Sequence, residues 1–165
     1  MSLLRKLTPC LMVESLPDIS LDLLWEKGVR GLIIDLDNTL VPWGGFEIPP
    51  SAEAWLREAQ EQGFKIFLVS NALEERVNHF RENLDIPGVS RAQKPRRGAF
   101  RLALSQMGLE KNQVAVVGDQ IFTDVWGGNR LGLFTILVSP VDDKELFFTR
   151  LVRRLEKRVL KRLKT

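Results

Sequence analysis

The sequence predicts an α/β fold in which a doubly wound, mostly parallel sheet lies between two layers of helices. Short apolar runs of strand length recur along the chain, and segments with the apolar spacing of helices separate them. A parallel strand buried on both faces reads as a continuous apolar run, and its alternation with helices is typical of βαβ units. The expected strands cover residues 31–35, 65–70, 89–91, 113–118 and 134–138.

The expected helices fill the intervals between these strands. Ser51 follows two prolines and is predicted to cap a helix that ends at Gly63, since serine favours the N-cap and glycine the position after the last turn. The pair Gly127-Gly128 is interpreted as a close helix-packing contact rather than a phosphate-binding loop. The other helices are expected at about 73–84, 97–107 and 122–131.

Length and composition predict a single domain over residues 1–165, with a short helical or irregular lead-in at 1–28. The chain has 165 residues and is 44% hydrophobic, which suits one sizeable core. No apolar run reaches the roughly 18–20 residues that span a bilayer, and Cys10 is the only cysteine. These features favour a cytoplasmic protein without an internal disulfide.

Positive charge is concentrated at the C-terminus. From Lys144 onward, nine basic residues stand against two acidic ones, although the whole chain carries a net charge of only +3. Apolar residues recur here every three or four positions, so residues 144–165 are predicted to form a basic amphipathic helix. Such a helix can lie on anionic lipid at the inner face of a membrane, or pack on the sheet with an ordinary solvated basic face. Nucleic acid is disfavoured as a partner because aromatic stacking residues do not alternate with the basic ones.

Two carboxylates follow the first apolar strand. Asp35 and Asp37 stand in the segment Ile-Ile-Asp-Leu-Asp-Asn-Thr-Leu of residues 33–40, and an extended chain would point both the same way. Open α/β sheets place their chemistry at the carboxyl ends of such strands. Because two neighbouring anions repel each other, this pair requires a cation, a shared proton or a ligand.

Further polar side chains follow the later strands. Ser70-Asn71 and Asp119 each come directly after an apolar run, Asp124 lies a helical turn beyond, and Lys94 precedes a helix. A doubly wound sheet would gather all of them at one edge. Clustered carboxylates suit Mg²⁺, lysine and serine can bind phosphate, and an aspartate can attack phosphorus. The combination predicts phosphoryl transfer.

Four of these segments, taken in order, resemble the four motifs of the haloacid dehalogenase superfamily of phosphatases. They are Asp-Leu-Asp-Asn-Thr at 35–39, Ser70-Asn71, Lys94-Pro95, and Gly118-Asp119 with Asp124. The resemblance covers roughly residues 28–140 and implies the Rossmann-like fold of that superfamily. The finer pattern is similar to the YqeG-type branch of subfamily IIIA, whose members include phosphatidylglycerophosphate phosphatases.

The resemblance implies a role for each carboxylate. Asp35 would be the nucleophile and a Mg²⁺ ligand. Asp37 would be the general acid and base, with its backbone carbonyl on the metal, and its presence favours a phosphatase over a dehalogenase. Asp119 would complete the metal site, and Asp124 would ligate the metal or support the site. Taken singly, Asp119 and Asp124 are also ordinary acids for the first turn of a helix.

The resemblance also implies a phosphate-binding set. Thr39 would buttress the loop, Ser70 with Asn71 would hold the phosphoryl oxygens, and Lys94 would neutralise phosphate and nucleophile. Asn71 followed by Glu74 is equally a helix-start pattern. Lysine on its own is most often solvated.

The gaps between the motifs predict an open site without a cap domain. About thirty residues separate Asp37 from Ser70, and a helix and a strand occupy most of them. The loop Val41–Pro50, with Trp43 and Phe46, is the expected minimal flap. His79, the only histidine, is expected at the surface or the core edge.

These inferences together predict a Mg²⁺-dependent phosphatase that hydrolyses a phosphomonoester through an aspartyl-phosphate. The resemblance and the basic C-terminus favour phosphatidylglycerophosphate as the substrate and phosphatidylglycerol as the product, and so a role in phospholipid metabolism. One alternative is a soluble sugar phosphate, a nucleotide or a phosphoprotein as substrate. An alternative of another class is a non-enzymatic interaction protein that retains the fold.

Overall fold

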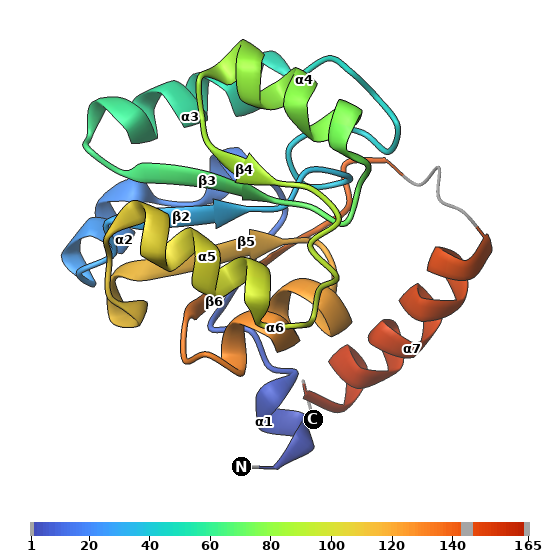
Figure 1. Cartoon of the computed structure of the whole chain (residues 1–165). Helices are drawn as coiled ribbons and strands as arrows, with labels where there is room; N and C mark the ends of the chain where they lie inside the picture. The colour runs from blue at the N-terminus through green and yellow to red at the C-terminus, as the bar shows by residue number, and fades with distance from the viewer. Residues whose placement is uncertain (1, 143–146, 164–165) are drawn as a thin grey trace.

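The computed structural model describes residues 2–142 and 147–163, and these form one sheet of six strands flanked by helices (Figure 1). The strand order is β1-β6-β5-β2-β3-β4, and every neighbouring pair is parallel. The predicted mostly parallel sheet is thereby confirmed. The strands are β1 (Leu11–Val13), β2 (Gly31–Ile34), β3 (Lys65–Val69), β4 (Gly88–Val89), β5 (Val114–Gly118) and β6 (Phe134–Val138).

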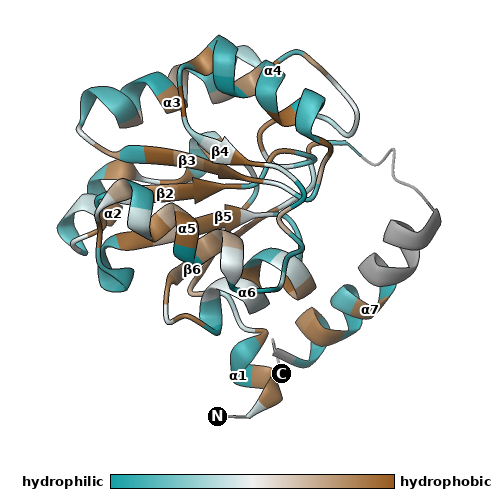
Figure 2. Cartoon of the chain, in the orientation of Figure 1, coloured by the Kyte–Doolittle hydropathy of each residue, from teal (hydrophilic) through white to brown (hydrophobic). Residues whose placement is uncertain are grey.

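Helices cover both faces of the sheet, which confirms the three α/β/α layers. One apolar cluster joins α2, α3 and α4 to one face, and a second cluster joins α5 to the other. Figure 2 shows the strands as mostly apolar and the flanking helices as a mixture of hydrophilic and apolar residues. The helices are α1 (Leu3–Lys6), α2 (Leu21–Glu26), α3 (Pro50–Glu61), α4 (Glu74–Leu84), α5 (Gly98–Met107), α6 (Trp126–Asn129) and α7 (Phe147–Leu163).

The N-terminal segment is more than the predicted helical or irregular lead-in. Leu11–Val13 form the edge strand β1, in which Leu11 is in register with Ile136 of β6. The backbone N–H of Cys10 continues this contact by donating to the carbonyl of Thr135 (2.8 Å). A strand of three residues is too short to show alternation or an apolar run, and its partner strand comes more than a hundred residues later, so the sequence pattern did not reveal it.

Two helices also differ from the prediction at their beginnings. Ser51 is not an N-cap, because α3 begins at Pro50 and no side chain caps it; proline is favoured in the first turn, where its missing N–H costs no hydrogen bond. The helix expected at 122–131 is instead a π-helical turn, Ile121–Val125, followed by the short helix α6. Such turns occur often at functional sites.

The paired glycines do serve close packing, as predicted. A Cβ atom on Gly127 would lie 2.5 Å from the ring of Phe100 in α5, and one on Gly128 would lie 2.6 Å from the methyl group of Thr135 in β6. Only glycine lets α6 approach α5 and β6 this closely. The segment that follows the π-helical turn is therefore held against the sheet.

The second half of the C-terminal helix α7 packs on the body. Val159 and Leu160 contact a small cluster that includes Leu7 and Ile121. Glu156 is 3% exposed, and it is the only acidic residue of α7. Packing was expected for the first half of the helix, at Phe147 and Phe148, whose side chains lie outside the described residues.

The opposite side of α7 is basic and exposed. The predicted segment 144–165 is longer than the helix, and residues 144–146 and 164–165 lie outside the described residues. No helix within the described ranges is long and apolar enough to cross a membrane. The exposed basic side chains among residues 154–162 are Arg154, Lys157, Arg158, Lys161 and Arg162.

Candidate active site

The carboxyl ends of the three central strands bring the predicted polar residues together. Asp35 follows β2, Ser70 follows β3, and Asp119 follows β5. The register pairs Ile34 of β2 with Leu68 and with Val117, so the strands end at the same level. The expectation that these residues meet at one sheet edge is correct, and Figure 1 shows β2, β3 and β5 pointing toward that same edge.

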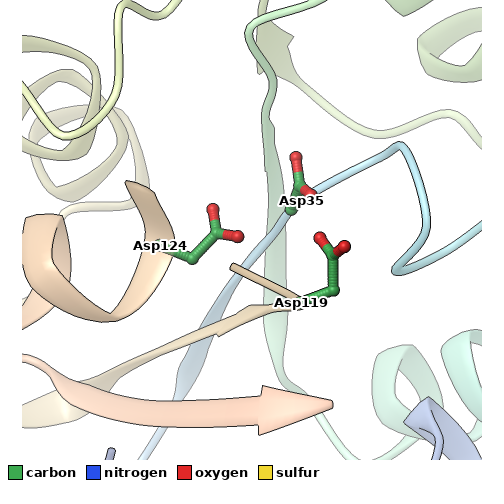
Figure 3. A group of neighbouring side chains, drawn as sticks. All are labelled: Asp35, Asp119 and Asp124. Atoms are coloured by element: carbon green, nitrogen blue, oxygen red, sulfur yellow. The ribbon is translucent and has the colours of Figure 1, made fainter. Parts of the chain in front are cut away.

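Three carboxylates converge at this edge (Figure 3). Asp35, Asp119 and Asp124 each offer an oxygen, and these oxygens all lie within 4.8 Å of one another. The hydroxyl of Thr39 lies 3.2 Å from Oδ2 of Asp35 and 3.2 Å from Oδ1 of Asp119. Buried anions this close together repel one another. The cluster therefore requires positive charge, and hard oxygen donors of this kind fit Mg²⁺.

Lys94 supplies part of that positive charge. Its Nζ atom lies 2.8 Å from Oδ1 of Asp35 and 2.6 Å from Oδ1 of Asp124, and only 3% of its side chain is exposed. Burial alone would lower the pKa of Lys94, but attraction by Asp124 and then by Asp35 outweighs burial and raises it. Burial raises the pKa of Asp124 to about 6, against the opposing effect of Lys94. One lysine thus offsets only part of the cost of burying this cluster.

The turn that carries Asp124 is fixed at several points. Oδ2 of Asp124 accepts a hydrogen bond from the backbone N–H of Gln120 (3.2 Å). A Cβ atom on Gly118 would overlap the Asp124 carboxyl group, so the site requires glycine there. The buried Glu156 of α7 accepts from the backbone N–H of Phe122 (3.2 Å). The C-terminal helix therefore contacts the same turn.

Asp37 lies apart from the carboxylate cluster and pairs with an arginine. Its Oδ1 atom is 2.7 Å from Nη2 and 3.1 Å from Nε of Arg76, and it also accepts from the backbone N–H of Gly44 (3.3 Å). Sequence reasoning missed Arg76. Its position in the first turns of a helix after Ser70-Asn71 is a signal that could have found it.

Three of the phosphate-binding candidates, Ser70, Asn71 and Lys94, line a pocket at this edge, and Thr39 does not. Ser70 is 1% exposed, and its hydroxyl oxygen accepts from the backbone N–H of Ala72 (3.1 Å). Asn71 does not cap α4, because the N-cap residue is Leu73 and no side chain caps the helix. Oδ1 of Asn71 instead accepts from the backbone N–H of Lys94 (2.9 Å). The pocket has a volume of about 300 Å³ and is lined by Asp35, Asp37, Trp43, Gly44, Ser70, Asn71, Ala72, Arg76, Lys94, Gln120 and Thr123.

The loop Val41–Pro50 forms one wall of the pocket, as expected of a minimal flap. Trp43 contributes to the lining. Phe46 is 59% exposed, and its ring meets that of His79 edge to face at 5.2 Å. His79 also contacts Phe80 in this way, with ring centroids 5.0 Å apart. The only histidine is thus an aromatic contact at the core edge, as predicted.

Comparisons with known proteins agree with this fold. The family model for haloacid dehalogenase-like hydrolases matches residues 43–132. A curated protein of Bacillus subtilis (strain 168), "Probable phosphatase YqeG", is 45% identical over 92% of this chain and 88% of its own length. The chain therefore belongs to the haloacid dehalogenase-like hydrolases. The prediction that the chain belongs to this superfamily is confirmed, and so is the prediction that it is a phosphatase.

Two further similarities are more distant. "Phosphatidylglycerophosphate phosphatase 1, chloroplastic/mitochondrial" of Arabidopsis thaliana is 30% identical over 93% of this chain, which spans only 47% of that protein. A solved structure from Legionella pneumophila, described as a subfamily III A hydrolase of the superfamily, has a TM-score of 0.50, 21% identity and 60% coverage of each chain. The latter similarity bears on the fold alone.

Proposed function

We propose that the protein is a Mg²⁺-dependent phosphatase that hydrolyses a phosphomonoester, with Asp35 as the nucleophile. The observation that carries this proposal is the position of Lys94, which lines the pocket with Asp35 and also contacts the buried Asp124. A buried ammonium next to a carboxylate at a strand end can hold a phosphate dianion against that carboxylate despite their like charges.

The chemistry proceeds in two displacements. An oxygen of Asp35 attacks phosphorus, the bond from phosphorus to the leaving oxygen breaks, and Asp37 donates a proton to that oxygen. In the second step, water attacks the aspartyl-phosphate while Asp37 takes a proton from it. The phosphorus–oxygen bond to Asp35 then breaks and releases inorganic phosphate. Ser70 and Asn71 face the transferred group from the pocket wall.

The three clustered carboxylates fit a divalent cation. Asp35, Asp119 and Asp124 together would hold Mg²⁺, with Thr39 fixing the relative positions of the first two. When bound, the metal supplies positive charge to the phosphoryl oxygens. Lys94 alone leaves excess negative charge in the cluster, so the donor set requires such a cation.

We propose phosphatidylglycerophosphate as the substrate. The similarity to the Arabidopsis phosphatase supports this headgroup, and the pocket opens without a cap domain among the described residues, which suits a phosphate on a large molecule. The test is phosphate release with Mg²⁺ from phosphatidylglycerophosphate in mixed micelles, beside a panel of sugar phosphates, nucleotides and a phosphopeptide. We expect release from the lipid and loss of release on chelation. Release from a soluble ester alone would overturn the lipid assignment, and no release from any ester would overturn the phosphatase.

We also propose that α7 brings the enzyme to anionic lipid at the inner face of the membrane. Replacing Arg154, Lys157, Arg158 and Arg162 by glutamine is expected to weaken binding to phosphatidylglycerol vesicles at least tenfold, because each basic residue near such a surface contributes roughly 1 kcal/mol. Co-sedimentation at low and high salt measures this. The matched control replaces four exposed basic residues elsewhere, Arg57, Arg81, Arg101 and Lys111, by glutamine. Equal binding by both variants would disprove the contact between α7 and lipid.

A further inference from the structure

Arg76 presents a cationic side chain to the pocket and pairs there with Asp37, which is not one of the three clustered carboxylates. It lines the pocket together with Lys94. Lys94 is committed to Asp35 and Asp124, whereas Arg76 pairs with Asp37 at 2.7 Å and keeps 14% of its side chain exposed. The two cations of the pocket lining therefore pair with different carboxylates.

The donor groups of Arg76 are only partly used. Its Nε and Nη2 atoms donate to Asp37, while Nη1 takes part in none of the hydrogen bonds found among the described residues. An arginine has five N–H donors in a planar fork that matches the oxygens of phosphate. One edge of the guanidinium thus remains able to receive an anion without releasing Asp37.

Aromatic rings hold this guanidinium in place. Its central carbon lies 5.2 Å from the ring centre of Phe46 on the flap and 5.5 Å from that of Phe80 in α4. Phe80 is 1% exposed, so one ring belongs to the rigid core. Cation–π contacts at these distances favour a fixed orientation. Arg76 is preorganised, which lowers the cost of binding an anion.

The partner of Arg76 indicates which part of the substrate it meets. Asp37 is the proposed proton donor to the leaving oxygen, and Arg76 pairs with Asp37. Arg76 would therefore lie beside the leaving group, whereas Lys94 would lie beside the phosphoryl group. Building on the proposed function, we propose that Arg76 binds a second phosphate carried by the leaving group. The preferred substrate then has a terminal phosphomonoester and a further phosphate nearby, as in a phospholipid headgroup or a soluble bisphosphate.

The test compares substrates that differ only in the second phosphate. Fructose 1,6-bisphosphate and fructose 6-phosphate form the soluble pair, and short-chain phosphatidylglycerophosphate is the lipid arm. We expect the wild type to prefer the doubly phosphorylated substrates in kcat/KM. For Arg76→Gln this preference should fall by about 10- to 100-fold, the range for one lost charge-assisted contact, mainly through KM. Arg76→Lys should retain part of it. Arg81→Gln, on the exposed side of the same helix, is the matched control.

Binding separates this proposal from the proposed function. The affinity of fructose 1,6-bisphosphate and of fructose 6-phosphate is measured by calorimetry on Asp35→Asn and on the double variant with Arg76→Gln. A preference that persists without Arg76 overturns the role of Arg76, as does an equal loss of kcat/KM on all substrates. An inactive wild type whose binding preference still depends on Arg76 would overturn the phosphatase alone. Preference for the lipid arm or for the bisphosphate identifies the source of the second phosphate.

Discussion

Replacing Asp35 by asparagine is expected to lower phosphate release by a factor on the order of 10⁴ or more, as loss of a catalytic nucleophile does in other enzymes. The amide cannot form the aspartyl-phosphate, yet it has nearly the same shape as the carboxyl group. Lys94 keeps its contact with Asp124 at 2.6 Å, so the fold should persist. The measurement is single-turnover phosphate release with Mg²⁺, accompanied by thermal unfolding.

A second readout distinguishes a lost nucleophile from a disturbed site. Acid quenching during turnover of a ³²P-labelled substrate should trap label on the wild-type chain and none on Asp35→Asn. The matched control is Asp22→Asn, an exposed aspartate whose partner is Gln62 (2.8 Å) and which lies outside the site. Equal labelling of wild type and Asp35→Asn would contradict the proposed chemistry.

The sequence predicted that three of the site residues meet at one sheet edge, because each of the three directly follows a strand. Asp35, Ser70 and Asp119 are one residue past β2, β3 and β5, and parallel strands end at a common edge. Local apolar runs were therefore enough to place side chains that are far apart in the chain. Knowledge of the packing angles between helices was not needed.

The parts that the sequence did not predict depend on contacts between distant segments. The Arg76–Asp37 pair joins residues that are 39 positions apart. Arg76 lies in the first turn of α4, which begins shortly after β3 ends, whereas Asp37 follows β2. β1 is defined by its pairing with β6 rather than by its own three residues. The π-helical turn at Ile121–Val125 packs Asp124 against Gly118. The spacing of apolar residues in the sequence does not predict such a turn.

Replacing Lys94 by methionine is expected to lower the free energy of unfolding, measured with a chelator present, by roughly 3–5 kcal/mol. Methionine has a similar length but no charge, so Asp35 and Asp124 would lose their 2.8 Å and 2.6 Å ion pairs inside the protein. Buried carboxylates without a counter-charge are costly. Urea unfolding followed by fluorescence of the tryptophans gives this quantity. Phosphate release should also fall, because no ammonium would remain to hold the phosphate against Asp35.

Magnesium should restore part of the stability lost with Lys94, because a cation bound by the three carboxylates replaces some of the missing positive charge. The gain in unfolding free energy on adding Mg²⁺ should then be larger for Lys94→Met than for the wild type, since a ligand that binds only the folded state stabilises it more when it binds more tightly. Lys111→Met, at an exposed position, is the control and should behave as the wild type. If Lys94→Met were as stable as the wild type in chelator, the carboxylates would not depend on Lys94. If Mg²⁺ gave both proteins no added stability, the cluster of Asp35, Asp119 and Asp124 would not be the metal site.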